Sequence, residues 1–227
     1  MPMRLGIVIP ARDEAETLPL LLADLQCLRA PDVEIIVVDG GSRDATLARA
    51  EGLADQLLTS EAGRARQLAA GAACTHAATL VFLHADTRVS PAAARAIAAL
   101  GASDGGWGFF RVRLCGNSWL LPVVACCMWW RSRISGIATG DQGLFVSREL
   151  FAVVGGYPAQ PLMEDIEICR RLGAVMPGRA IDIELQGSGR RWDRDGALRT
   201  IVLMWWLRLR YFLGASPAAL HRRYYRT

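Results

Sequence analysis

Two stretches decide the fold of this chain: LGIVIP at residues 5–10 and VEIIVVD at residues 33–39. Continuous β-branched runs of this length are typical of buried parallel strands. Between them, residues 15–29 carry leucines at positions 18, 21, 22 and 25, which is helical spacing. A strand, a crossover helix and a second strand make a βαβ unit, so the sequence predicts a parallel sheet.

The same alternation continues along the chain. It predicts a helix around 46–52, a short strand at 56–59, a helix at 63–73, a strand at 79–84 and a helix from Pro91 to Leu100. After Gly101 the pattern changes, and WGFFRVRL at 107–114 and QGLFVS at 142–147 predict further strands. No linker or repeat divides the sequence. We therefore expect a single α/β domain with a doubly wound, mixed but mostly parallel sheet flanked by helices, followed by added C-terminal helices.

Charge and cysteine content exclude several classes of protein. The net charge is +4, and nine arginines follow Gly187, which suits phosphate or an anionic membrane surface. Nucleic acid is not expected as a partner, because no zinc finger, RNA-recognition signature or stacked-aromatic motif accompanies this charge. The six cysteines lack CxxC spacing and are expected to be buried in a reducing compartment. The first residues lack a signal peptide, which predicts a cytoplasmic protein.

Two apolar segments raise the question of membrane contact. Residues 118–130 (SWLLPVVACCMWW) are only 13 residues long, short of the roughly 20 that span a bilayer. Residues 198–213 are interrupted by Arg199, Arg208 and Arg210. Neither is expected to span. Tryptophan flanked by arginine is typical of a peripheral helix on the inner membrane face, and equally of a helix packed on the domain, so both interpretations stay open.

Polar clusters follow three of the predicted strands: PARDE at 10–14, DGGSRD at 39–44 and HADT at 84–87. Parallel strands bring their carboxyl ends to one edge of the sheet, where ligands bind in such folds. A structural interpretation competes at Asp39, which could form a turn while Asp44 caps the next helix. The glycine pattern GxGxxG of dinucleotide sites is absent.

Six segments in order resemble family 2 glycosyltransferases. They are VVDGGSRDAT at 37–46, GRARQLAAG at 63–71, FLHADT at 82–87, GDQGLF at 140–145, GGYPAQPLMEDIEICRRL at 155–172 and GRRW at 189–192. The signatures DGGS, LHAD, GDQ, LMED and RRW resemble more closely a bacterial subgroup labelled arsenosugar-biosynthesis glycosyltransferases. The resemblance implies a GT-A fold with one domain over 1–227. Its nucleotide-binding half would cover about 1–100, its acceptor and catalytic half about 101–197, and its amphipathic helices about 198–227.

The resemblance also implies a reaction and its residues. A sugar would pass from a UDP- or GDP-linked donor to the hydroxyl of a small-molecule or lipid acceptor, with inversion and with Mg²⁺ or Mn²⁺. Asp165 would be the general base and Asp86 the metal ligand, because such ions accept one or two carboxylates beside substrate phosphates. The implied substrate-binding residues are Pro10, Ala11, Glu14, Asp39, Arg64, Ala85, Asp86, Asp141, Gln142, Glu164, Arg190, Arg191 and Trp192.

This chain departs from the family pattern at four positions. His84 stands for the first acid of the metal motif, Asp13 and Ala69 stand where relatives have asparagine, and Ser188 stands for the glutamine of QxxRW. Structural interpretations also remain: acids in the first turn of a helix complement its dipole, GDQ could be a turn, and RRW could be a solvated basic turn.

Two other functions compete with glycosyl transfer. A sugar nucleotidyltransferase needs a glycine-rich loop after the first strand, and residues 10–14 contain no glycine. A non-catalytic nucleotide-binding or membrane-surface module needs neither Asp86 nor Asp165.

Overall fold

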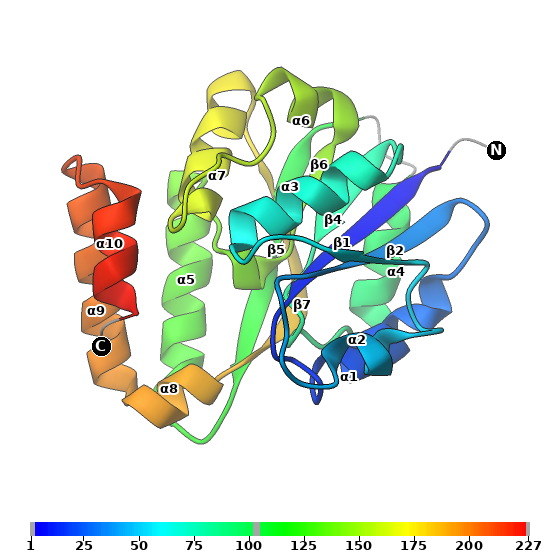
Figure 1. Cartoon of the computed structure of the whole chain (residues 1–227). Coiled ribbons are helices and arrows are strands. Elements are labelled where there is room, and N and C mark those ends of the chain that lie inside the picture. The colour runs from blue at the N-terminus through cyan, green and yellow to red at the C-terminus, as the bar shows by residue number, and fades with distance from the viewer. Residues whose placement is uncertain (1–2, 102–104, 226–227) are drawn as a thin grey trace.

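The computed structural model describes residues 3–101 and 105–225, so the last two residues of the predicted C-terminal segment lie outside it. One seven-stranded sheet runs through the molecule in the order β3-β2-β1-β4-β6-β5-β7 (Figure 1). The strands are β1 (Leu5–Ala11), β2 (Val33–Asp39), β3 (Gln56–Thr59), β4 (Thr79–Phe82), β5 (Trp107–Cys115), β6 (Leu144–Ser147) and β7 (Arg179–Ser188).

The helices alternate with the strands and then continue past the sheet. They are α1 (Leu18–Leu25), α2 (Thr46–Ala50), α3 (Arg64–Cys74), α4 (Pro91–Leu100), α5 (Leu121–Ser135), α6 (Arg148–Val153), α7 (Glu164–Val175), α8 (Arg190–Asp195), α9 (Ala197–Phe212) and α10 (Pro217–Tyr224). Two 3₁₀ turns, η1 (Gln26–Leu28) and η2 (Gly140–Gln142), complete the described elements.

The sheet is mixed and mostly parallel, which confirms the predicted fold class. β1 pairs in parallel with β2 and β4, and β2 with β3, whereas β6 runs antiparallel to both β4 and β5. An antiparallel strand starts where its neighbours end, and Leu144 at the start of β6 pairs with Phe82 at the end of β4. The segment before β6 therefore arrives at the same sheet edge as the loops after β1, β2 and β4.

Each face of the sheet is covered by its own set of helices. Alternate residues of a strand point to opposite faces, so Ile7 and Ile9 of β1 pack with the leucines of α1 and with α4, while Val8 packs with α3. The periodicity in the sequence thus corresponds to two cores, one on either side of a buried sheet.

The C-terminal helices form an outer layer beside α5 and α7 (Figure 1). Leu207 of α9 and Leu220 of α10 are buried against Met163 and Ile166 at the start of α7. None of the helices in the described ranges combines the length and apolar character needed to cross a bilayer.

Candidate active site

The carboxyl edge of the sheet gathers most of the predicted residues. Asp39 ends β2, and its carboxylate accepts hydrogen bonds from the amides of Gly41 (2.9 Å) and Ser42 (3.0 Å) and from the Ser42 hydroxyl. Asp44 is not the N-cap of α2, which is Ala45, but it accepts from the Thr46 amide at 3.0 Å. Both acids thus shape the loop, as the structural interpretation expected, and the nucleotide role of Asp39 stays a prediction.

Gln67 of α3 fixes the ends of β1 and β2 relative to each other. Its Nε2 atom donates to the carbonyls of Ala11 and Val38, both at 2.8 Å. A side chain at Gly40 would lie 2.9 Å from the Gln67 amide group. The sequence predictions did not include Gln67, although it lies in the GRARQ segment quoted for the family resemblance.

Arg190, the first residue of α8, bridges two of the strand-end loops. Its Nη2 atom donates to both carboxylate oxygens of Glu14, at 2.8 and 3.1 Å, and lies 3.4 Å from Oδ2 of Asp86. Ala11 and Ala85, beside these acids, are buried, while Pro10 is half-buried. The Arg190 guanidinium therefore links the loop after β1 to the loop after β4, although Arg190 is distant from both in the sequence.

His84, Asp86 and Asp141 form a compact group. His84 Nδ1 lies 3.9 Å from Oδ1 of Asp86 and 3.8 Å from Oδ1 of Asp141. Burial, with a further contribution from the Arg64 guanidinium, lowers the pKa of His84 to about 3 against the opposing pull of Asp86. The imidazole is therefore neutral at pH 7, and among the described residues its buried Nε2 atom has no hydrogen-bond partner.

The carboxylates of this group fit a divalent cation shared with substrate. Burial raises the pKa of Asp86, and Asp141 and Glu14 raise it further. Burial also raises the pKa of Asp141. Carboxylates that disfavour one another's charge suit a hard cation with oxygen ligands. Such an ion commonly keeps oxygen ligands from water or substrate phosphates, and in the described ranges no three His, Cys, Asp or Glu side chains are grouped to hold a metal by themselves.

Glu164 and Asp165 are neighbours in sequence but have different surroundings. Met163 precedes them in a left-handed conformation (φ 65°) and starts α7. Glu164 is buried, and its Oε1 atom pairs with Nη1 of Arg64 at 2.8 Å. Burial raises the pKa of Glu164 while Arg64 opposes the rise. Asp165 instead accepts from the amides of Gly140 (3.3 Å) and Ile166 (2.8 Å), which turns its carboxylate toward η2.

Three predicted residues contact other parts of the protein. Gln142 is fully buried: its Oε1 atom accepts from Ser132 (2.8 Å) and from the Thr139 amide (3.0 Å). Arg191 donates to the Tyr224 hydroxyl and stacks on that ring, 3.8 Å from its centroid. Trp192 packs against the cluster of Val112, Leu114, Leu121 and Ala125. The structure does not bring Arg191 and Trp192 to the acids.

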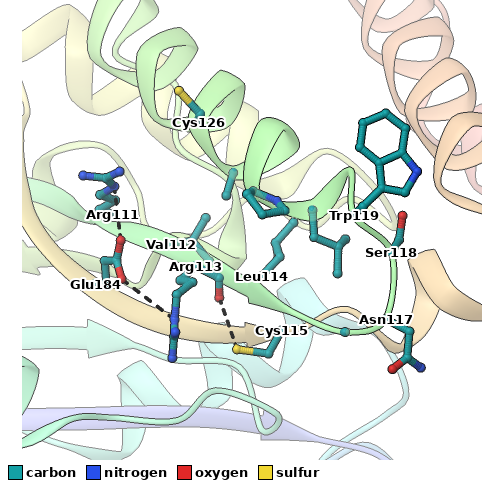
Figure 2. A pocket seen from close by; sticks show the side chains of 14 residues that line it. Arg111, Val112, Arg113, Leu114, Cys115, Asn117, Ser118, Trp119, Cys126 and Glu184 are labelled. Atoms are coloured by element: carbon teal, nitrogen blue, oxygen red, sulfur yellow. Dashed lines mark hydrogen bonds and ion pairs between the residues drawn. The ribbon is translucent and has the colours of Figure 1, made fainter.

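A separate cavity of about 580 Å³ lies between β5 and the start of α5. Figure 2 shows Trp119 at one end and Arg111, Arg113 and Glu184 at the other. It contains none of the predicted site residues.

A family model matches the amino-terminal part of the chain. Residues 6–105 match the glycosyl transferase family 2 model. The match covers β1 to β4 and their loops, including Asp39, Arg64 and Asp86. A search of curated proteins found no match.

Solved structures share the fold at low identity. A mannosyltransferase from Pyrobaculum calidifontis, solved with GDP-mannose and Mn²⁺, is 21% identical with a TM-score of 0.59, covering 82% of this chain and 57% of that one. Staphylococcus aureus TarS, solved with UDP-GlcNAc, is 13% identical with a TM-score of 0.61, covering 83% and 58%. Glucosyl-3-phosphoglycerate synthase from Mycobacterium tuberculosis, solved with Mn²⁺, UDP and glucosyl-3-phosphoglycerate, is 20% identical with a TM-score of 0.59, covering 88% and 77%.

This chain spans less than two thirds of the length of the first two of these proteins. Its sheet and helices have the GT-A architecture of these glycosyltransferases. The partial family 2 match and the GT-A fold agree with each other.

Proposed function

We propose that this chain transfers a sugar from a UDP- or GDP-linked donor to an acceptor hydroxyl, with inversion at the anomeric carbon and with Asp165 as the general base. The observation that carries the proposal is the separation of the two acids at the start of α7. Glu164 is neutralised in an ion pair with Arg64, whereas Asp165 keeps its carboxylate beside η2 with two amide donors and no ion pair among the described residues.

The donor would lie along the carboxyl edge of β1, β2 and β4. Pro10, Ala11, Glu14 and Asp39 would surround the nucleoside, and Arg64 and Arg190 are the cations beside the diphosphate position. Asp86, with Ala85 and Asp141 next to it, would hold Mg²⁺ or Mn²⁺, and the solved relatives with Mn²⁺ support this choice. When bound, the ion supplies positive charge to the departing diphosphate.

Asp165 would take the proton of the acceptor hydroxyl as its oxygen bonds to the anomeric carbon. The bond between that carbon and the diphosphate oxygen breaks on the opposite face, and the electron pair leaves with the nucleoside diphosphate. Arg64 and Arg190 would then stabilise the charge that develops there. Arg191, Trp192 and the Gln142 side chain take no part in this proposal, because they contact other parts of the protein.

Asp165→Asn tests the proposal because it preserves size and removes the basic site. We expect kcat to fall by about 10²–10⁴-fold, the usual contribution of general-base catalysis, while donor binding changes little. Glu167→Gln on the same helix is the matched control, because Glu167 pairs with Arg170 and Arg171 and with none of the predicted site residues. Turnover kept by the Asp165 variant and lost by Glu164→Gln would mean that the base is the other acid.

We also propose that α5 and α9 contact an anionic surface on the inner membrane face. Their outward sides carry large apolar residues, and neither helix nor α10 contains an acidic residue. The narrower resemblance to the arsenosugar subgroup stays part of this proposal and rests on the signatures DGGS, LHAD, GDQ, LMED and RRW.

A further inference from the structure

Two arginines that the sequence analysis did not select lie near Asp165. Arg131 belongs to α5 and Arg208 to α9, two helices that lie side by side in Figure 1. The neighbouring Ser132 hydroxyl bonds to Gln142 beside η2, while Leu207 packs against Ile166 next to Asp165. Both guanidiniums therefore come from positions adjacent to the elements that hold Asp141 and Asp165.

The two guanidiniums are close enough to interact with each other and with the same acid. Burial, together with repulsion from Arg208, lowers the pKa of Arg131 to about 10 against the opposing pull of Asp165 and Asp141. Burial likewise lowers the pKa of Arg208, and Asp165 opposes the shift. Two like charges thus share one partly desolvated space beside Asp165.

Neither guanidinium forms an ion pair within 4 Å among the described residues. Arg131 has one long hydrogen bond, to Ser132 at 3.2 Å, and its buried Nε atom has no partner. Arg208 makes no hydrogen bond or ion pair in residues 3–101 and 105–225. Asp165 attracts both guanidiniums but forms an ion pair with neither, and its oxygens accept from the Gly140 and Ile166 amides. Burying unpaired charge is costly, which indicates that an anion completes this site.

We propose that Arg131 and Arg208 bind a phosphate group of the acceptor next to Asp165. Two guanidiniums present forks of donors that match phosphate oxygens. A phosphate monoester carries a charge near −2 at neutral pH, which balances the pair, whereas a carboxylate balances only one. This assignment rests on the proposed glycosyl transfer for its purpose and narrows the acceptor to a phosphate monoester, either a free metabolite or a lipid phosphate.

The same two helices provide matched controls. Arg133 and Arg210 lie two residues further along α5 and α9 but are exposed, where they stack on Trp130 and Trp206. The double variant Arg131→Met/Arg208→Met and the control Arg133→Met/Arg210→Met therefore have the same net charge and alter the same helices. Both double variants keep Arg64 and Arg190, so phosphate bound near those residues contributes equally to the two variants. The difference in phosphate affinity between the variants therefore reports on the proposed site.

The experiment uses inorganic phosphate in one arm and vesicles of phosphatidylcholine with phosphatidate in the other. Phosphate should raise the melting temperature of the wild type and of the control, and its affinity should fall by about tenfold or more in the Arg131/Arg208 variant. A loss seen with free phosphate alone identifies a soluble phosphorylated acceptor. A loss seen with phosphatidate vesicles alone identifies a lipid phosphate, provided that it exceeds the loss in the Arg133/Arg210 control, whose exposed arginines also attract anionic vesicles.

Equal binding by both double variants in both arms would overturn the proposal. The melting temperature without phosphate tests whether a variant misfolds. It should not fall in Arg208→Met, because the guanidiniums of Arg131 and Arg208 repel each other when no anion is bound. Wild-type binding of UDP or GDP with Mn²⁺ is measured separately. Its absence would contradict the proposed glycosyl transfer and leave the phosphate result standing.

Discussion

At the scale of single residues, the site separates side chains that look equivalent in the sequence. Glu164 and Asp165 are both acids in the first turn of a helix, where either could simply complement the helix dipole. Because successive residues of a helix point about 100° apart, one acid turns to Arg64 and the other to η2. The Asp39 carboxylate holds its own loop, and in the proposed function it would also contact the nucleoside.

In the proposed function Asp86 is the residue that binds the divalent metal ion. We expect Asp86→Asn to lose the metal-dependent part of nucleoside diphosphate binding, at least about tenfold, the lower end of losses for residues that only support a ligand. Calorimetry with UDP and GDP, with and without Mn²⁺, measures this. Asp182→Asn is the control, because Asp182 pairs with Arg111 elsewhere on the protein. An unchanged metal effect in Asp86→Asn would show that the ion is held elsewhere.

At the scale of elements, η2 and β6 differ from the predicted strand at 142–147. The strand starts only at Leu144, because Gly143 adopts a left-handed conformation (φ 59°) and Gln142 closes a capping box with Thr139. The sequence analysis also did not predict β7, although Ile181, Ile183 and Leu185 alternate with polar residues. A hydrogen bond from the Ser132 hydroxyl of α5 also holds the Gln142 side chain of η2 in place.

Gly140 in η2 should not tolerate a side chain. A β-carbon there would collide with the Arg64 guanidinium and the His84 ring. Gly140→Ala should destabilise the protein by about 1–3 kcal/mol, the usual cost of overpacking, and weaken nucleotide binding. Gly173→Ala is the control, since its β-carbon meets only Trp107 at 3.8 Å, and we expect a gain of about 0.5–1 kcal/mol from helix propensity. Thermal denaturation of both variants measures the difference, and equal behaviour would contradict the packing argument.

At the scale of the whole molecule, α5 and α9 present apolar side chains outward from neighbouring positions. On α9 these are Leu198, Val202, Trp205, Leu209 and Phe212, and on or just before α5 they are Trp119, Val123, Trp130 and Ile134. The spacing follows one side of each helix. Trp205 is 72% exposed, although the inner side of the same helix buries Leu207. Packing on the domain and contact with a membrane, which the sequence left as alternatives, are therefore compatible on opposite sides of α9.

Binding to anionic vesicles should depend on this surface. A buried aromatic side chain contributes about 1.5–3 kcal/mol, so Trp130→Ser/Trp205→Ser should weaken binding at least about tenfold. Salt should weaken the wild type, because it screens attraction to the arginines. Sedimentation with neutral and anionic vesicles measures both effects. Val153→Ser/Val175→Ser, on exposed positions of α6 and α7, is the control. Equal binding to neutral and anionic vesicles would leave only the packed-helix interpretation.

The sequence by itself determined the features that depend on neighbouring residues. Alternation and helical spacing predicted strands such as 5–10 and 33–39 and the helix between them, because burial of one face imposes a period on the chain. The polar clusters after β1, β2 and β4 were predicted to share one edge because the connections of parallel strands require it. The order of motifs also predicted the family 2 resemblance that the match over residues 6–105 supports.

Only the tertiary structure decided which side chains meet across long separations. Arg190 reaches Glu14 because β7 returns α8 to the first loop. Arg208 lies near Arg131 because α9 packs through Leu207 against Ile166 of α7. The tertiary structure also places the Arg191 side chain against Tyr224 and not against the acids of the site. The physical reason is that sheet order and helix packing are fixed by the sum of many buried contacts. A sequence pattern records that a residue is polar or apolar, but not which distant charge it will face.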